Sequence, residues 1–267
     1  MSVKLGFIGA GNMASAIIGG VISSGKFSGA DVLVSDFVEE KVAQLSIEYG
    51  VESADNIRVA GEADVIFLCV KPNVYDDVIK EIRHVVAANK IIVAIAAGKT
   101  LKYLDGAFEN IPKIVRAMPN TPSLVGQGMT AVCPAPNVPK KDADSVLDIF
   151  NGVGKARFLP EALFDAFTGV AGSSPAYAFM FIEAMADAGV AHGLSRDDAM
   201  RFSAQALLGS AQMVLSTGNH PGALKDAVCS PGGATIAAVA KLEQEGLRNA
   251  VIQGVNACVE KSKQMAL

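Results

Sequence analysis

Two glycine-containing loops in this 267-residue sequence combine residue types that can hold an anion. The first starts at Gly9-Ala10-Gly11, where Gly9 permits a tight turn and Gly11 lets the backbone approach a pyrophosphate. An apolar run, Leu5–Ile8, precedes it, and a helical pattern follows, with Ala14 small enough for the helix to pack on its strand. Free N–H groups at the start of that helix favour a phosphate. The pattern predicts a dinucleotide site; the alternative is a tight turn between a core strand and a core helix.

An acidic residue, Asp36, follows the next apolar run, Val32–Val34, about 20 residues beyond the glycine loop. A carboxylate at this place in a dinucleotide-binding fold holds the adenosine ribose. Asp36 therefore extends the prediction from a phosphate site to a nucleotide site.

The second loop contains Ser230-Pro231-Gly232-Gly233 and leads directly into a helical pattern. Its two glycines let successive backbone N–H groups curl into a nest, which together with the helix start makes an anion cradle. Thr235, at the helix entry, offers a hydroxyl that can cap the helix or contact a ligand. A plain capped turn would explain Gly233 and Thr235, but it would not require the four residues as a unit.

Groups for acid–base catalysis are scarce. The only histidines are His84, His192 and His220. We interpret His84, on a predicted helix, and His192, near a helix end, as solvated or capping side chains. Lys71 can contact a phosphate or a ribose, or it can be a solvated loop lysine. Cys229 could be a thiol nucleophile, but the sequence places no base near it, so a buried small residue is the favoured interpretation.

Alternating apolar runs and helical patterns, up to about Leu159, predict a parallel sheet covered by helices. The predicted strands are Leu5–Ile8, Val32–Ser35, Val65–Val70, Ile91–Ala96, Lys113–Ala117, Met129–Cys133 and Lys155–Phe158. The predicted helices are Met13–Ser24, Glu39–Tyr49, Tyr75–Val86 and Asp142–Asn151. Three strands end in loops, at Lys71-Pro72, Gly98 and Pro119–Pro122, and ligands of open α/β sheets bind at that edge.

Beyond Pro160 the strand signals end. The predicted helices are Glu161–Val170, Pro175–His192, Asp197–Ser216, Pro221–Val228, Thr235–Gln244 and Leu247–Gln264. The sequence predicts a doubly wound, mostly parallel α/β domain of the Rossmann type over residues 1–160 and an all-α domain over 161–267. Few charges interrupt the second domain, so we expect its helices to pack against a second copy; the alternative is a monomeric bundle.

Composition restricts the possible functions. Net charge is −4 with no basic cluster, which argues against nucleic-acid binding. The four cysteines are scattered without zinc-type spacing, which predicts no metal site and a reducing, cytoplasmic setting. Residues 202–224 carry no formal charge, but their glutamines, asparagine, histidine and proline argue against a membrane span and favour a buried helix.

The chain resembles the pyrroline-5-carboxylate reductases along nearly its whole length. The resemblance rests on GFIGAGNMASAI, VKP, RAMPNTP, GSSPAYAFMFIEAMADAGV and HPGALKDAVCSPGGATIAAV. Many dehydrogenases share the first motif, whereas the last is close to diagnostic. The resemblance implies reduction of 1-pyrroline-5-carboxylate to L-proline with NADPH or NADH, the last step of proline biosynthesis. It also implies a homodimer in which interlocked helical domains complete each active site, and a decameric ring of dimers.

The resemblance also implies roles for individual residues. It assigns the substrate carboxylate to Ser230, Gly232, Gly233 and Ala234, and a catalytic contact with the ring nitrogen to Thr235. The cofactor-binding residues expected from the loops and the resemblance are Gly9, Gly11, Asn12, Met13, Ser35, Asp36, Asn56, Val70, Lys71, Pro72, Ala97 and Asn120.

Asp36 departs from the family pattern. The stretch Ser35-Asp36-Phe37 lacks the cluster of basic or small hydroxyl residues expected around a 2′-phosphate, and the Asp36 carboxylate repels that phosphate. We therefore expect NADH to be favoured over NADPH. The implied substrate is a cyclic imine that can be protonated in water before it binds, so hydride transfer needs orientation more than acid–base assistance.

Two other classes of function remain open. Oxidoreductases acting on 3-hydroxy acids share the two-domain plan but place a lysine on a helix in the site, and the predicted helix Pro175–His192 has no lysine. A non-catalytic dinucleotide sensor would bind the cofactor without oxidising NADH in the presence of pyrroline-5-carboxylate.

Overall fold

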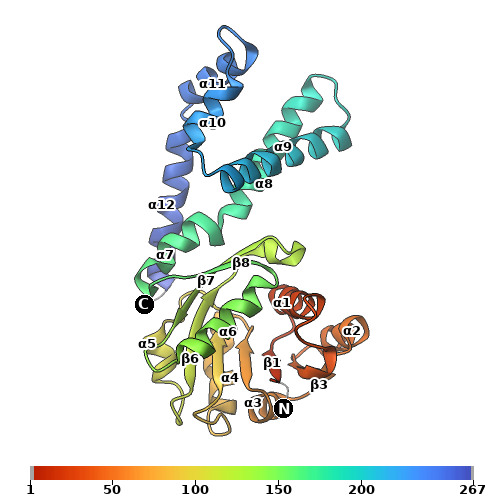
Figure 1. Cartoon of the computed structure of the whole chain (residues 1–267), viewed down its shortest axis with the longest axis vertical. Helices are drawn as coiled ribbons and strands as arrows, with labels where there is room; N and C mark the ends of the chain where they lie inside the picture. Colours follow the sequence, from red (N-terminus) through yellow and green to blue (C-terminus); the bar gives the residue numbers. More distant parts are fainter. Residues whose placement is uncertain (1–2, 266–267) are drawn as a thin grey trace. The chain divides into compact units, whose positions relative to one another are not determined.

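The computed structural model describes residues 3–265. It divides into two compact units: one runs up to Ser173 and takes in the chain again from Cys258, and the other is Ser174–Ala257. All the strands of the described chain belong to the first unit, and the second is helical (Figure 1). The assignment of domains at residue 160 stays a prediction.

An eight-stranded sheet forms the centre of the first unit, in the order β3-β2-β1-β4-β5-β6-β7-β8. Neighbouring strands are parallel except β6 and β7, which are antiparallel. The strands are β1 (Leu5–Ile8), β2 (Val32–Ser35), β3 (Glu52–Ser53), β4 (Val65–Leu68), β5 (Ile91–Ala94), β6 (Lys113–Met118), β7 (Gly128–Pro134) and β8 (Gly154–Phe158). The predicted fold class is confirmed, and the chain order reverses at β1, between β2 and β4.

Helices cover both faces of the sheet because successive strand residues point to opposite sides. The helices on one face are α1 (Asn12–Ser23), α2 (Glu39–Tyr49) and α6 (Lys140–Asn151). Those on the other are α3 (Asn56–Glu62), α4 (Tyr75–Ile82) and α5 (Leu101–Asp105). Phe7 and Phe67 stack on the first face with ring centroids 4.7 Å apart, and Phe150 of α6 packs edge-on against Phe67. Ile8 and Leu68 face the second group of helices.

Several elements differ from the sequence predictions. The elements β3, α3 and α5 were not predicted, because β3 has two residues and α5 five, too few for a hydrophobic period to show. Helix α4 ends at Ile82, so His84 lies in a turn beyond it and not on a helix. The single helix predicted over Glu161–Val170 is instead a 3-10 turn, the short helix α7 (Phe164–Phe167) and a π-helical turn.

The remaining helices follow the sequence patterns closely. They are α8 (Ser174–Ala191), α9 (Arg196–Thr217), α10 (Pro221–Val228), α11 (Ala234–Gln244) and α12 (Leu247–Met265). Ser195 caps α9 by accepting the N–H of Asp198, and Gly218 ends it in the left-handed conformation. None of the helices in the described part of the chain has both the length and the apolar character needed to cross a membrane.

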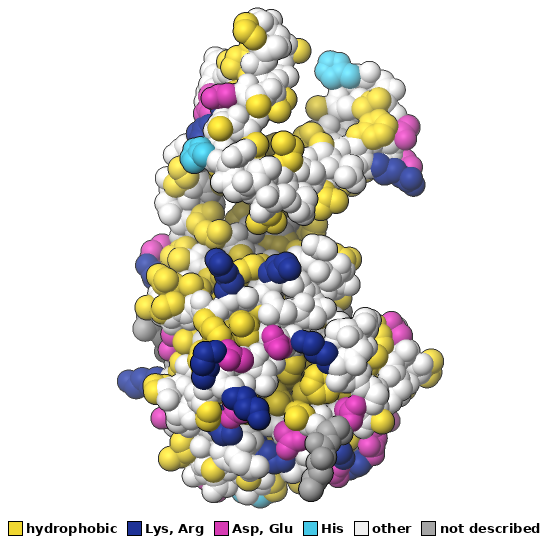
Figure 2. Space-filling model, in the orientation of Figure 1, with side chains coloured by type: hydrophobic (Ala, Val, Ile, Leu, Met, Phe, Trp, Pro, Cys, Tyr) yellow, Lys and Arg dark blue, Asp and Glu magenta, His cyan; other side chains and the backbone are white. Residues whose placement is uncertain are grey.

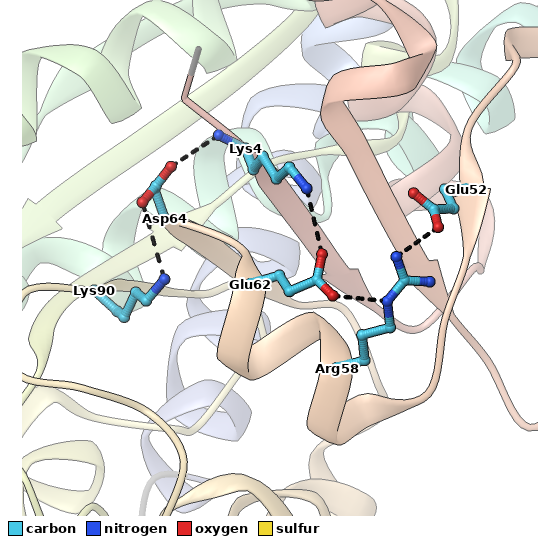
Figure 3. A network of polar contacts seen from close by, with 6 residues as sticks. All are labelled: Lys4, Glu52, Arg58, Glu62, Asp64 and Lys90. Carbon is cyan, nitrogen blue, oxygen red and sulfur yellow. Dashed lines mark hydrogen bonds and ion pairs between the residues drawn. The ribbon is translucent and has the colours of Figure 1, made fainter. Parts of the chain in front are cut away.

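An ion-pair network joins the amino ends of the strands to α3 (Figure 3). Arg58 contacts Glu62 at 2.8 Å and Glu52 at 2.5 Å, and Lys4 reaches Glu62 at 3.3 Å. The hydrogen bond from Arg58, followed by that from Lys4, lowers the pKa of Glu62 below its ordinary value. The network lies at the end of the sheet opposite the loops that follow the strands.

We expect Glu62→Gln to lower the Tm at pH 7, because Arg58 and Lys4 lose a shared carboxylate. Since the pKa of Glu62 is lowered in the folded state, its contribution is fully present above its ordinary pKa of 4.5. That contribution is lost as pH falls through the lowered pKa. Calorimetry should therefore show the Tm difference from wild type shrinking below that value, and also in high salt. A difference that is the same at acid pH would contradict this account.

Candidate functional site

The glycine loop is held between the ends of β2 and β4. The N–H of Gly9 donates to the carbonyl of Ser35 at 2.7 Å, and the N–H of Cys69 donates to the carbonyl of Ile8 at 2.8 Å. Gly9 has φ +103°, and a Cβ on it would lie 2.8 Å from the Cys69 carbonyl carbon. Only glycine meets both conditions, so this position is set by the fold.

Gly11 is different, because the protein itself does not require a glycine there. Its φ of −78° suits any residue, and a Cβ would meet no atom within 4 Å. Gly11 is also the N-cap of α1, which has no side-chain cap and no acidic residue in its first turn. The open backbone and the uncapped N–H groups fit the close approach of a pyrophosphate, as predicted for the cofactor.

Asp36 is hydrogen-bonded to the backbone of the same loop. Its carboxylate accepts the N–H of Ala10 at 2.6 Å through one oxygen and the N–H of Val38 at 2.8 Å through the other. The side chain is half-buried at the end of β2, where the sequence analysis placed the ribose. Asp36 thus has a structural role as well as the predicted one.

A cavity of about 570 Å³ opens beside this loop. Its lining residues are Ile8, Gly9, Gly11, Asp36, Phe37, Lys41, Asn56, Cys69, Val70, Lys71, Val74, Asp77, Val78 and Glu81. Half of the predicted cofactor residues are therefore brought together here. Phe37, fully exposed beside Asp36, offers an aromatic face to a planar base. The sequence analysis missed it as a site residue, although an aromatic directly after the ribose acid was a usable signal.

A chain of polar side chains lies at the β2 end of the cavity. The hydroxyl of Ser35 donates to Asn56 Oδ1 at 2.7 Å, and Asn56 Nδ2 donates to Glu81 Oε2 at 2.7 Å. Ser35 is 5% exposed and lies behind Asn56, while Asn56 and Glu81 line the cavity. Asn56 begins α3 behind Asp55, whose side chain accepts the N–H of Arg58. Glu81 was not among the predicted residues.

The other predicted cofactor residues do not line this cavity. They are Asn12, Met13, Ser35, Pro72, Ala97 and Asn120. Asn120 is buried and ties loops together: its Nδ2 donates to the Ala171 carbonyl at 2.9 Å, and its Oδ1 accepts the N–H of Met129 at 2.8 Å. The structure therefore shows Asn120 supporting the loop after β6.

Tyr75 is a buried residue of the site's scaffold that sequence reasoning missed. Its hydroxyl donates to the carbonyl of Leu68 at 2.7 Å and accepts the N–H of Ala96 at 3.3 Å. It thereby joins the carboxyl ends of β4 and β5, the edge that bears the Lys71 and Ala97 loops. Burial raises the pKa of Tyr75 well above its ordinary value, so the phenol stays protonated.

Arg116, in β6, also joins neighbouring elements through its side chain. It is 5% exposed, donates to Glu161 at 2.8 Å and lies 4.5 Å from the centre of the Phe164 ring. The Glu161 carboxylate also accepts the N–H of Leu101 at 2.7 Å. One partly buried ion pair therefore links β6, the start of α5 and the 3-10 turn after β8.

The Ser230–Thr235 loop belongs to the second unit. Gly232 has φ +67°, the N–H of Gly233 donates to the Ser230 carbonyl at 3.0 Å, and α11 begins at Ala234. A Cβ on Gly233 would lie 2.3 Å from Ser230 Oγ, so a larger residue there would displace that hydroxyl. Gly233 provides no side-chain cap for α11, and Thr235 is exposed in its first turn. The loop thus combines a tight turn with a helix start that has no side-chain cap, and the binding of an anion there stays a prediction.

Two further candidates are now placed. His220 caps α10, because its Nδ1 accepts the N–H of Gly222 at 3.1 Å. Cys229 is half-buried just beyond α10. The structure thus gives His220 a capping role that the sequence did not predict for it.

The doubly wound sheet, with a glycine loop at its switch point and an uncapped helix behind it, defines a dinucleotide-binding protein of the Rossmann class. A family model described as pyrroline-5-carboxylate reductase dimerisation matches residues 161–265. A second, described as NADP oxidoreductase coenzyme F420-dependent, matches residues 4–98.

Full-length relatives give the particular family. The chain is 49% identical over 267 residues to a pyrroline-5-carboxylate reductase of Escherichia coli (strain K12), covering 100% of this chain and 99% of that one. It matches a pyrroline-5-carboxylate reductase structure from Coxiella burnetii with a TM-score of 0.93 and 31% identity over 100% of both chains. The structure of a Plasmodium falciparum pyrroline carboxylate reductase with NADP bound matches with a TM-score of 0.88 and 32% sequence identity. The match covers 99% of this chain and 98% of that one. This chain belongs to the pyrroline-5-carboxylate reductase family.

We expect Tyr75→Phe to lower the free energy of unfolding by about 1–3 kcal/mol, because a buried carbonyl and a buried N–H lose their shared partner. Tyr49→Phe is the matched control, since Tyr49 is half-buried on α2. Urea denaturation measures both variants. Equal, small changes in the two would show that the Tyr75 hydroxyl does not hold the strand ends together.

Proposed function

We propose that this protein reduces 1-pyrroline-5-carboxylate to L-proline, the last step of proline biosynthesis. The observation that carries the proposal is the full-length match to a pyrroline-5-carboxylate reductase, in a chain that has both anion-binding loops. A nicotinamide dinucleotide supplies the hydride, which forms the new C–H bond at the imine carbon. The ring nitrogen takes the electron pair of the C=N bond and keeps the proton acquired from water.

The substrate-binding part of the proposal rests on the loop before α11. Ser230, Gly232, Gly233 and Ala234 bind the carboxylate, since free N–H groups at a helix start attract an anion. Thr235, exposed in the first turn, holds the ring nitrogen. These residues orient the imine, and no side-chain acid is needed because the substrate already carries the proton on its ring nitrogen.

The cofactor part of the proposal rests on the open backbone at Gly11 and on the cavity beside it. The proposed contacts are Gly9, Gly11, Asn12, Met13, Ser35, Asp36, Asn56, Val70, Lys71, Pro72, Ala97 and Asn120. We further propose residues 1–160 as the dinucleotide-binding domain and 161–267 as the substrate-binding and dimerisation domain. Four free cysteines suit a reducing, cytoplasmic setting.

A homodimer, assembled further into a decameric ring, is also part of the proposal. In a single chain the helices α8 to α12 expose large apolar side chains, which Figure 2 shows over much of their surface. Examples are Phe179, Met180, Phe202, Leu208, Leu215 and Ile252. The segment 202–224, expected to be a buried helix, is largely exposed in one copy. Burial of such a surface is what a second subunit supplies.

The direct test is the oxidation of NADH or NADPH, followed at the nicotinamide absorbance, with pyrroline-5-carboxylate as substrate. We expect turnover with the wild type. Cofactor binding without turnover would identify a dinucleotide sensor instead and overturn the proposed reaction.

Thr235→Ala should lower kcat/KM at least tenfold, roughly the value of one hydrogen bond made in the transition state. Cofactor affinity, measured by fluorescence titration, should not change. Thr235→Ser keeps the hydroxyl and serves as the control, with most of the activity retained. Steady-state kinetics that Thr235→Ala leaves unaltered would exclude this role.

For the cofactor we propose that NADH is used with a higher kcat/KM than NADPH, because Asp36 places a fixed carboxylate at the ribose end. Asp36→Ser should reduce the difference between the kcat/KM values measured with NADH and with NADPH. Since this variant also loses the acceptor for Ala10 and Val38, the ratio of the two kcat/KM values is the measurement and not either value alone. A wild-type preference for NADPH would contradict this use of Asp36.

A further inference from the structure

We propose that Glu81 is a specificity-determining residue, which through Asn56 makes the ribose end of the cavity accept a 2′-hydroxyl and reject a 2′-phosphate. The inference rests on the proposed use of a nicotinamide dinucleotide and adds a second determinant to Asp36. It assigns a function to a residue of α4 that no sequence motif singled out.

The first step is that Glu81 fixes the orientation of Asn56. The Asn56 amide is held from both ends: its oxygen accepts from Ser35 at 2.7 Å, and its nitrogen donates to Glu81 at 2.7 Å. A flipped amide would set its oxygen against the Glu81 carboxylate, which only accepts hydrogen bonds, so Glu81 selects the orientation. The three side chains come from β2, α3 and α4, and they converge where β2 ends.

The second step concerns hydrogen-bond donors. A 2′-phosphate dianion needs donors, and the hydroxyl proton of Ser35 and one N–H of Asn56 are already committed within the chain. The chain ends in a carboxylate, which only accepts. A ribose hydroxyl can donate to such a group, whereas a phosphate dianion cannot and is repelled by it.

The third step is the position of the charge. The cavity is lined by the acids Asp36, Asp77 and Glu81 and by two lysines, so a count of charges alone does not decide the preference. Both oxygens of Asp36 accept backbone N–H groups of the loops, which partly offset its charge. Glu81 is exposed and is bonded to the residue that touches Ser35, so its charge acts beside the ribose position.

The test measures the binding of adenosine fragments, independently of turnover. Calorimetry compares 5′-AMP with adenosine 2′,5′-bisphosphate on the wild type and on Glu81→Gln, which removes the charge and keeps the size of the side chain. We expect the variant to bind the bisphosphate about five- to tenfold more tightly relative to AMP, the effect of one nearby like charge. The Tm of the variant confirms that it is folded.

Asp77→Asn is the matched control, because it removes the same charge from the same cavity on the same helix without a bond to Asn56. We expect its ratio of affinities to stay within about twofold of wild type. An unchanged ratio in Glu81→Gln, an equal change in both variants, or no binding of either fragment would each overturn the proposal. Turnover with pyrroline-5-carboxylate is measured separately, so a wild type that binds the fragments but lacks reductase activity refutes the reaction and not the role of Glu81.

Discussion

The backbone hydrogen bonds that join the glycine loop to the end of β2 are the constraint on which the cofactor site depends. The N–H groups of Gly9 and Ala10 donate to the carbonyl of Ser35 and to the carboxylate of Asp36. These bonds place the open backbone of Gly11 at the start of α1, where a phosphate meets uncapped N–H groups. They also hold Asp36 at the proposed ribose position, so a single loop contact serves the fold and would serve the proposed choice of cofactor as well.

Around this loop, buried side chains hold the carboxyl ends of the strands in place. Tyr75 joins β4 to β5, and Arg116 joins β6 to Glu161. A rigid edge suits the proposed hydride transfer, which needs orientation of the reactants more than acid–base assistance. The polar chain from Ser35 to Glu81 fixes a further side chain of the cavity, since Asn56 is held between a hydroxyl and a carboxylate.

Much of the architecture follows from local patterns. The strand, glycine turn and helix at the start of the chain were predicted from Leu5 onwards, and so were the helices α2 and α10 with their bounds. Short elements such as β3 and α5 were not predicted, because they are too short to show a hydrophobic periodicity. The cavity contains only half of the predicted cofactor residues, because a motif indicates which loop meets a ligand and not which side chains line the space. The domain and site assignments stay predictions for this reason.

The sequence by itself determined the family, the two glycine-containing loops and the helical character of the second half, because each depends on neighbouring residues or on a motif. Only the tertiary structure decided which distant side chains meet. Ser35, Asn56 and Glu81 are separated by 21 and 25 positions, and they converge because β1 lies between β2 and β4 and brings α3 and α4 to one face. Strand order is a property of the whole chain, so no local pattern could have predicted the environment of Glu81.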